Sequence, residues 1–230
     1  MTREYRQRGF IRPPGATEVL LIRHGESRAA TAERPFPLVD GHGDPELHPD
    51  GRLQADRLAE RLRDQPIAAI YVTNLRRTTE TAAPLCRALG LTPVVVPELR
   101  EVHLGDWEGG LLRIKAHDND PIYQRVIAEQ RWDVIPNAES RERFHVRVMR
   151  GLARIVAAHR DQLVAAVVHG GVIAHVLAQA TAARPFAFNG ADNASISHIV
   201  VLPSDTIVLR RFNDTAHLTP VLTTKASELT

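Results

Sequence analysis

Short apolar runs alternate with amphipathic stretches along most of this 230-residue chain. The runs are three to eight residues long, and most are rich in Val, Ile and Ala, which is typical of strands buried on both faces. Two later runs are separated by a Pro-Ser-Asp turn, which predicts a final pair of neighbouring strands. The predicted strands cover residues 19–22, 68–72, 94–96, 163–168, 195–202 and 206–212.

Between these runs, apolar residues recur at helical spacing. Leu53, Leu58 and Leu62 predict one helical face after Asp50 and Gly51. A second helix is predicted over 78–89 with Gly90 as its stop signal, a third from Ser140, and a fourth from Val172. Two segments fit neither pattern. Residues 34–49, rich in Pro, Gly and His, predict a binding loop, and residues 111–135 predict irregular helices that cover another part of the molecule.

Strands that alternate with helices predict an α/β fold with three layers. We expect a mostly parallel central sheet with helices on both faces and one antiparallel edge strand from the final pair. Residues 1–17 predict an extended or disordered lead-in and residues 223–230 a polar tail. No repeat or linker divides residues 18–222, so we expect a single domain in which 110–139 form a cap or insert.

Composition narrows the class of protein. With 43% apolar and 24% charged residues, the chain is typical of a globular protein. The single cysteine, Cys86, excludes an internal disulfide, lies in an apolar helical pattern and favours a cytoplasmic setting. No apolar stretch is long enough to span a membrane, and no signal peptide is evident. A net charge of +2 does not support a nucleic-acid partner. The sequence is compatible with both a monomer and a homodimer.

Polar clusters follow three of the predicted strands. Arg23 and His24 come after the first strand, Arg76 and Arg77 after the second, and His169 after the strand at 163–168. Because the carboxyl ends of parallel strands meet at one edge of a sheet, where ligands bind, these clusters are expected to form one site.

Two histidines and several arginines favour phosphoryl transfer through a histidine. Neutral His24 can attack phosphorus, while the arginine forks stabilise the charge on the phosphoryl oxygens and His169 donates a further hydrogen bond. Glu101, just after the third strand, is placed to protonate the leaving oxygen. The sequence has no cluster of His, Cys or acidic residues at metal spacing, so we expect neither a metal nor another cofactor.

Five motifs in order resemble the histidine phosphatase superfamily, which includes the phosphoglycerate mutase-like proteins, and favour its phosphatase branch. The resemblance implies that His24 becomes phosphorylated, that Arg77 rather than Arg76 binds phosphate, and that Glu101 is the proton donor. His169 matches the second histidine of the family. The motifs are residues 23–27, 44–55, 73–82, 99–109 and 169–171, with a weaker match at 136–140.

Some positions depart from the family pattern or have two interpretations. An asparagine that touches phosphate in many members is replaced by Ala30, so one contact is either lost or supplied by the Pro-rich loop. The Ser27 hydroxyl either binds phosphate or caps the following turn, and the Gly170 N–H is a further anion contact. Four other histidines are expected on the surface or in loops: His42, His48, His103 and His117.

These inferences predict a histidine acid phosphatase-like phosphomonoesterase. It would hydrolyse a small-molecule phosphomonoester without a metal, through a phosphohistidine at His24. Two alternatives remain open. One is a phosphoglycerate-mutase-type phosphotransferase, disfavoured by the lack of an evident second basic cluster after Gly109. The other is a binding module for a phosphorylated ligand, which Ala30 favours.

Overall fold

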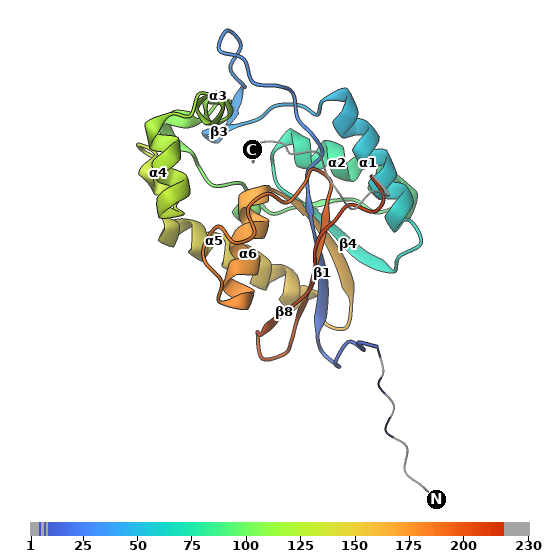
Figure 1. The fold of residues 1–230 in the computed structure, drawn as a ribbon. Coiled ribbons are helices and arrows are strands. Elements are labelled where there is room, and N and C mark those ends of the chain that lie inside the picture. Colours follow the sequence, from blue (N-terminus) through green and yellow to red (C-terminus); the bar gives the residue numbers. More distant parts are fainter. Residues whose placement is uncertain (1–4, 6, 8, 219–230) are drawn as a thin grey trace, which may run out of the picture.

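A computed structural model describes residues 5, 7 and 9–218, and a mixed six-stranded sheet lies at its centre (Figure 1). Its strand order is β5-β4-β6-β1-β7-β8. The first four strands in that order are mutually parallel, whereas β7 is antiparallel to both β1 and β8. The mostly parallel sheet and its antiparallel edge pair are therefore confirmed. The strands are β1 (Thr17–Arg23), β4 (Ile67–Val72), β5 (Val94–Val95), β6 (Leu163–Val168), β7 (Ile196–Val201) and β8 (Ile207–Asp214).

Helices cover both faces of the sheet, as expected for three layers. Alternate residues of β1 explain the arrangement, because successive side chains of a strand point to opposite faces. Ile22 packs in a core with Leu58 and Leu85, whereas Leu21 packs in a second core with Leu152 and Leu177. The buried Cys86 belongs to the first core. The helices are α1 (Pro49–Leu62) and α2 (Arg76–Leu89) on one side, and α5 (Arg141–Ala158) and α6 (Gly170–Thr181) on the other.

Local sequence sets the start of helix α5, but a contact with a distant loop sets the start of α2. For α5 the sequence allowed either Asn137 or Ser140 as the cap; Ser140 takes this role by accepting a hydrogen bond from the Arg143 N–H at 3.3 Å, and such caps contribute about 1 kcal/mol. Helix α2 begins two residues earlier than predicted and has no side-chain cap of its own. Instead Asp44, from a distant loop, accepts the Arg76 N–H at 2.7 Å. A contact between remote segments therefore extends this helix, and local sequence does not reveal it.

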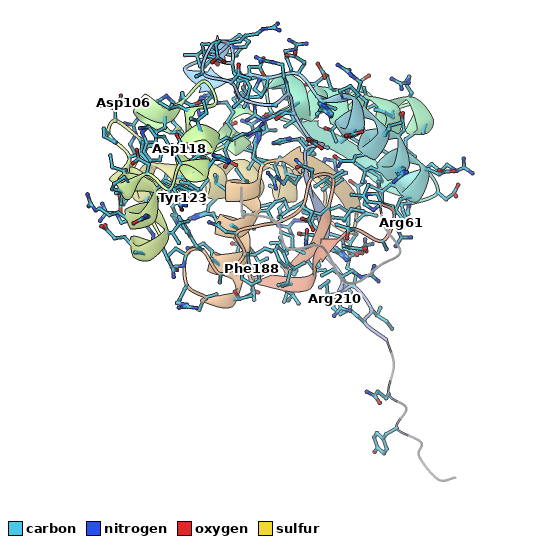
Figure 2. The ribbon with its side chains drawn as sticks, turned by 45° about the horizontal axis from the view of Figure 1, so that its top comes forward. Arg61, Asp106, Asp118, Tyr123, Phe188 and Arg210 are labelled. Atoms are coloured by element: carbon cyan, nitrogen blue, oxygen red, sulfur yellow. The ribbon has the colours of Figure 1, made fainter. Side chains whose placement is uncertain are left out.

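Residues 110–139, called the cap below, are more regular than predicted. They form α3 (Leu111–His117), α4 (Pro121–Glu129) and the 3₁₀ turn η3 (Trp132–Val134). Trp107, Val126 and Ile135 give this region a small core of its own. Figure 2 shows Tyr123 and Asp118 of the cap on the opposite side of the molecule from Arg61 of α1. The remaining 3₁₀ turns are η1 (Pro97–Leu99) and η2 (Gly105–Trp107).

The Pro-rich loop contains a short hairpin of β2 (Leu38–Val39) and β3 (His42–Gly43). Its turn places Asp40 and Gly41 at φ values of 49° and 81°, which Gly adopts freely and Asp tolerates. Asp40 is held by an ion pair with Arg100 at 2.8 Å. His42 lies in this loop, one of the two positions predicted for it, but it is buried, because the hairpin folds it inward against His103.

The segment before β1 is tied to the end of α5. The Gly15 N–H donates to Asp161 Oδ1 at 2.6 Å, and Arg12 forms an ion pair with Glu18 at 3.2 Å. The rest of the predicted lead-in (residues 1–4, 6 and 8) and the whole predicted tail lie outside the described residues. Among the residues that are described, no helix is both long and apolar enough to cross a membrane.

Candidate active site

The carboxyl ends of β1, β4 and β6 meet at one edge of the sheet, on the side where Figure 1 shows β3 and α3. A cavity of about 420 Å³ opens there, between the strand ends, the hairpin loop and the cap. Five of the predicted site residues line it: Arg23, His24, Arg77, Glu101 and Gly170. Residues from four separate parts of the sequence therefore converge as predicted, while Ser27 and His169 are buried and are not among the lining residues.

His24 directly follows β1 and is almost completely buried, with 6% of its surface exposed. Its Nδ1 lies 2.7 Å from the Gly25 carbonyl oxygen. Because a carbonyl can only accept, Nδ1 carries the proton and Nε2 keeps its lone pair. Nε2 accepts a hydrogen bond from Arg77 Nε at 3.2 Å. Burial, followed by the charges of Arg77 and Arg23, holds the pKa of His24 well below 6.5, so the imidazole is neutral near pH 7.

Two arginines place positive charge beside His24. Arg77 lies in the first turn of α2 and donates to the Gly43 carbonyl at 2.8 Å, and burial lowers the pKa of its guanidinium to about 10. Arg23 donates to the Ala191 carbonyl, and its Nε has no partner among the described residues. Both guanidinium groups remain charged near pH 7. The buried donors suit an anion such as phosphate.

Arg76 and Arg77 lie in different environments, and the resemblance assigned phosphate binding to Arg77. Arg76 is half exposed, with ion pairs to Glu80 at 3.2 Å and Glu46 at 3.8 Å. Arg77 instead points into the cavity wall beside His24. Adjacent residues in the first turn of a helix project about 100° apart, so only one of them can face the sheet edge.

His169 lies beside His24, in the buried part of the site. It follows β6 and is fully buried, with its ring centroid 5.3 Å from that of His24. Its Nε2 is 3.2 Å from Thr73 Oγ1, and its Nδ1 has no partner among the described residues. Burial, and next the charge of Arg77, hold its pKa well below 6.5. A phosphate contact of this imidazole stays a prediction. Gly170, the next residue, does line the cavity.

Two carboxylates line the cavity, and the sequence indicated only one of them. Glu101 accepts hydrogen bonds from the N–H groups of Val102 and Gly171, both at 3.0 Å. A Cβ at Gly171 would overlap the Glu101 carboxylate, so this glycine permits the approach of α6. Glu108 accepts from the N–H groups of Leu104 at 2.8 Å and Gly43 at 2.7 Å. It joins η2 to the hairpin loop.

A third cavity arginine comes from the cap, and the sequence analysis missed it. Arg113 of α3 donates to Ser27 Oγ at 2.8 Å and to the Arg28 carbonyl at 3.0 Å. The Ser27 hydroxyl oxygen thus already accepts a hydrogen bond from this arginine. Ala30 lies against the start of α3, because a Cβ at Gly110 would be 3.0 Å from the Ala30 Cβ. A small residue at position 30 allows the cap to approach this closely. The Pro-rich loop supplies Phe36 and His42 to the cavity, but no cation.

Two glycines hold the loop that carries His24. A Cβ at Gly25 would lie 2.6 Å from the Gly51 carbonyl oxygen, and a Cβ at Gly51 would overlap the Glu26 backbone. The start of α1 is therefore packed directly on the loop that carries His24. Neither glycine has a positive φ, so close backbone approach, not an unusual conformation, requires Gly here.

We expect Gly51→Ala to displace this loop. The added methyl group must move the backbone near His24, an overpacking effect that costs about 1–3 kcal/mol. The expected result is a lower melting temperature and at least about a 10-fold loss of kcat/KM on an aryl phosphate. Gly9→Ala is the matched control, because a Cβ at Gly9 meets nothing within 4 Å. Wild-type activity and stability in Gly51→Ala would contradict this interpretation of the loop.

Three potential metal ligands do come together, although the sequence did not indicate such a cluster. Ligand atoms of Glu26, His48 and Asp50 lie within 4.8 Å of one another, and both carboxylate residues are exposed. His48 Nδ1 already accepts the Asp50 N–H at 3.3 Å, and none of the three lines the cavity. His48 is the N-cap residue of α1, and Asp50 lies in its first turn.

The fold and the site together define a class: α/β proteins with a buried, neutral histidine beside arginines at the carboxyl edge of a mostly parallel sheet. The chain belongs to the histidine phosphatase superfamily, branch 1, whose model matches residues 19–215.

Relatives with similar sequences span most of the chain. It is 34% identical over 207 residues to phosphoglycerate mutase-like protein 4 of Arabidopsis thaliana, covering 87% of this chain and 86% of that protein. It is 29% identical over 211 residues to the metal-independent phosphoserine phosphatase of the same plant, covering 89% and 84%. The crystal structure of a mycobacterial glucosyl-3-phosphoglycerate phosphatase superposes with a TM-score of 0.72 at 28% identity, covering 87% and 100%. These relatives support a phosphatase activity for this chain.

Proposed function

We propose that this protein hydrolyses a small phosphomonoester through a phosphohistidine at His24, without a metal ion. The observation that carries the proposal is the state of the His24 imidazole, which is neutral, buried and oriented by the Gly25 carbonyl, with Nε2 beside the Arg77 guanidinium. A relative described as a metal-independent phosphoserine phosphatase supports the absence of a metal requirement. The fixed charges of Arg23 and Arg77 supply the electrostatic stabilisation for which other phosphatases use metal ions.

Two displacements at phosphorus complete the reaction. In the first, His24 Nε2 forms a bond to phosphorus while the bond to the ester oxygen breaks, and protonated Glu101 gives its proton to that oxygen. In the second, water forms a bond to phosphorus and gives a proton to the Glu101 carboxylate while the phosphorus–nitrogen bond breaks. Inorganic phosphate and the initial state of the enzyme result.

Arg113 is assigned as a third phosphate-binding arginine. Burial lowers its pKa, and its charge contributes to the lowered pKa of His24, so it lies within electrostatic reach of the nucleophile. Its position beside Ser27 Oγ places it next to the loop on which Ala30 replaces the phosphate-binding asparagine of many members. The cap then supplies a contact that the core of this chain lacks.

We expect Arg113→Gln to weaken phosphate recognition, because one charge-assisted contact is lost. The expected result is about a 10- to 100-fold loss of kcat/KM on an aryl phosphate and weaker competitive inhibition by inorganic phosphate. Arg125→Gln is the matched control: Arg125 is also a cap arginine, but it is exposed and paired with Glu129 at 3.0 Å. Unchanged inhibition by phosphate in Arg113→Gln would refute the assignment.

Trapping the covalent intermediate tests the proposal directly. After rapid mixing with an aryl phosphate and an alkaline quench, mass spectrometry is expected to find an acid-labile phosphoryl group on the peptide that contains His24. A chelator is expected to leave turnover unchanged. Loss of activity on chelation, or hydrolysis with the phosphoryl group on another residue, would contradict the proposal.

The same preparation separates the two alternatives. A mutase would interconvert phosphoglycerates and respond to a bisphosphoglycerate primer, whereas a hydrolase releases inorganic phosphate. A binding module would bind phosphate without forming the covalent intermediate.

A further inference from the structure

The cavity continues beyond the phosphate-binding end. A volume of about 420 Å³ lies within the range of roughly 300–1,000 Å³ that accommodates a drug-sized ligand, so it exceeds what a phosphate group alone requires. The additional wall comes from the cap, the Pro-rich loop and the segment between α6 and β7. Its largest side chains are Phe36, Trp107, Leu112, Tyr123, Trp132 and Phe186.

These side chains form a preorganised apolar surface. Trp107 is 4% exposed and packs in the small core of the cap. Trp132 and Phe186 are in ring contact, with centroids 5.1 Å apart. Aromatic rings fixed in this way bind flat or apolar groups at a low entropic cost.

The positive charges of the described lining gather toward its other end. The lining arginines are Arg23, Arg77 and Arg113; each lies near His24 or Ser27, and Arg113 also borders the wall, 5.4 Å from the Phe36 ring centroid. Three nearby basic residues do not line the cavity and are already paired: Arg28, which lies 4.9 Å from the Phe36 ring centroid, with Glu46 at 3.4 Å, Lys115 with Asp120 at 2.8 Å and Arg131 with Asp133 at 2.6 Å.

A second anionic group on the substrate therefore has no cation to meet beyond the phosphate. It would face apolar side chains and the carboxylates of Glu101 and Glu108. Burying a charge without a partner is costly. Neutral polar residues are available, since Gln130 and Asn189 line the same wall; the Gln130 amide oxygen also accepts the Phe186 N–H at 3.4 Å.

From this lining we infer that the substrate is a phosphomonoester of a large, uncharged and mainly apolar or aromatic alcohol, with one or two neutral hydrogen-bonding groups for Gln130 and Asn189. The inference rests on the proposed hydrolase function and adds the chemical class of the leaving group. It disfavours phosphorylated acids, such as phosphoserine and phosphoglycerate, as good substrates of this chain.

A matched series of esters tests the inference. Ethyl, 2-phenylethyl and 2-(2-naphthyl)ethyl phosphate have leaving alcohols of similar basicity, so differences in kcat/KM report on the wall of the cavity and not on leaving-group chemistry. We expect kcat/KM to rise by about 100-fold from ethyl to the aromatic esters. Phosphoserine and 3-phosphoglycerate are expected to rank below 2-phenylethyl phosphate. Either acid ranking equal to or above it would overturn the inference.

Two substitutions in the wall sharpen the test. Ile127, at 45% exposure, lines the cavity, so Ile127→Arg adds a cation without disturbing a core. We expect it to shift the preference toward 3-phosphoglycerate over 2-phenylethyl phosphate by about 10-fold. Val146→Arg, at an exposed apolar position outside the cavity, is the control and is expected to leave the preference unchanged. Ala116→Leu fills the wall and is expected to slow the naphthyl ester more than the ethyl ester.

Failure of this inference can be told apart from failure of the proposed function. If no ester is hydrolysed and no phosphohistidine forms, the hydrolase proposal is wrong. If the esters are hydrolysed through His24 with equal efficiency, or Ile127→Arg leaves the preference unchanged, only the inferred leaving group is wrong.

Discussion

Alanine in place of His24 is expected to reduce kcat on an aryl phosphate by about 10⁴-fold or more, because the bond-forming atom is lost. Arg23, Arg77 and Arg113 remain in this variant, so binding of inorganic phosphate is expected to persist. Stopped assays of phosphate release give the rate, and calorimetry with inorganic phosphate gives the affinity. The combination of lost turnover and retained binding distinguishes a missing nucleophile from a collapsed site.

His117→Ala is the control, since His117 is an exposed histidine at the end of α3. It is expected to match the wild-type rate. His42 is the histidine that offers a rival nucleophile, because it lines the cavity and its buried Nε2 has no partner among the described residues. If His24→Ala still forms a phosphohistidine and His42→Ala does not, the assignment of the nucleophile is wrong.

Glu101→Gln is expected to have an effect that depends on the leaving group. For an alkyl phosphate, whose alcohol cannot leave without a proton, we expect kcat/KM to fall by about 10²- to 10⁴-fold. For p-nitrophenyl phosphate the loss is expected to be about 10-fold or less, because this leaving group needs no proton. Hydrolysis of the intermediate still requires a base, so phosphohistidine is expected to accumulate in the variant. Rapid-quench labelling measures that accumulation.

Glu108→Gln is the comparison that decides between the two cavity carboxylates. Both Glu108 oxygens accept backbone N–H groups that join η2 to the hairpin loop. We therefore expect the substitution to lower the melting temperature and to slow alkyl and aryl esters to a similar extent. A leaving-group dependence in Glu108→Gln, and none in Glu101→Gln, would exchange the two roles.

The sheet and its functional edge could be predicted because burial on both faces leaves a strong signal. Residues of β1 and β6 contact cores on two sides, so Val19–Ile22 and Leu163–Val168 are apolar at every position, and the runs end abruptly at Arg23-His24 and at His169. Parallel pairing then places those ends at one edge. The convergence of Arg77 with them follows from the same rule.

The cap and its contribution to the site could not be predicted, since its residues serve several environments. Val126 is buried in a small local core, whereas Leu112 and Tyr123 contact that core and also line the cavity, and these mixed environments remove a clear helical period. Without that period, the sequence gives no sign that Arg113 differs from an ordinary surface arginine. Glu108 and His42 were missed for a related reason: their positions depend on contacts between the hairpin loop and η2 that are far apart in sequence.

The contact between Ala30 and Gly110 has a consequence for engineering. This contact positions α3, and α3 carries Arg113. A change that lifts the start of the cap is therefore expected to alter two properties at once: the shape of the cavity and the number of arginines that line it. Libraries that aim at new substrates therefore need to keep residues 110–113 fixed. Variation in α4 and around Phe186 can then change selectivity while turnover chemistry is preserved.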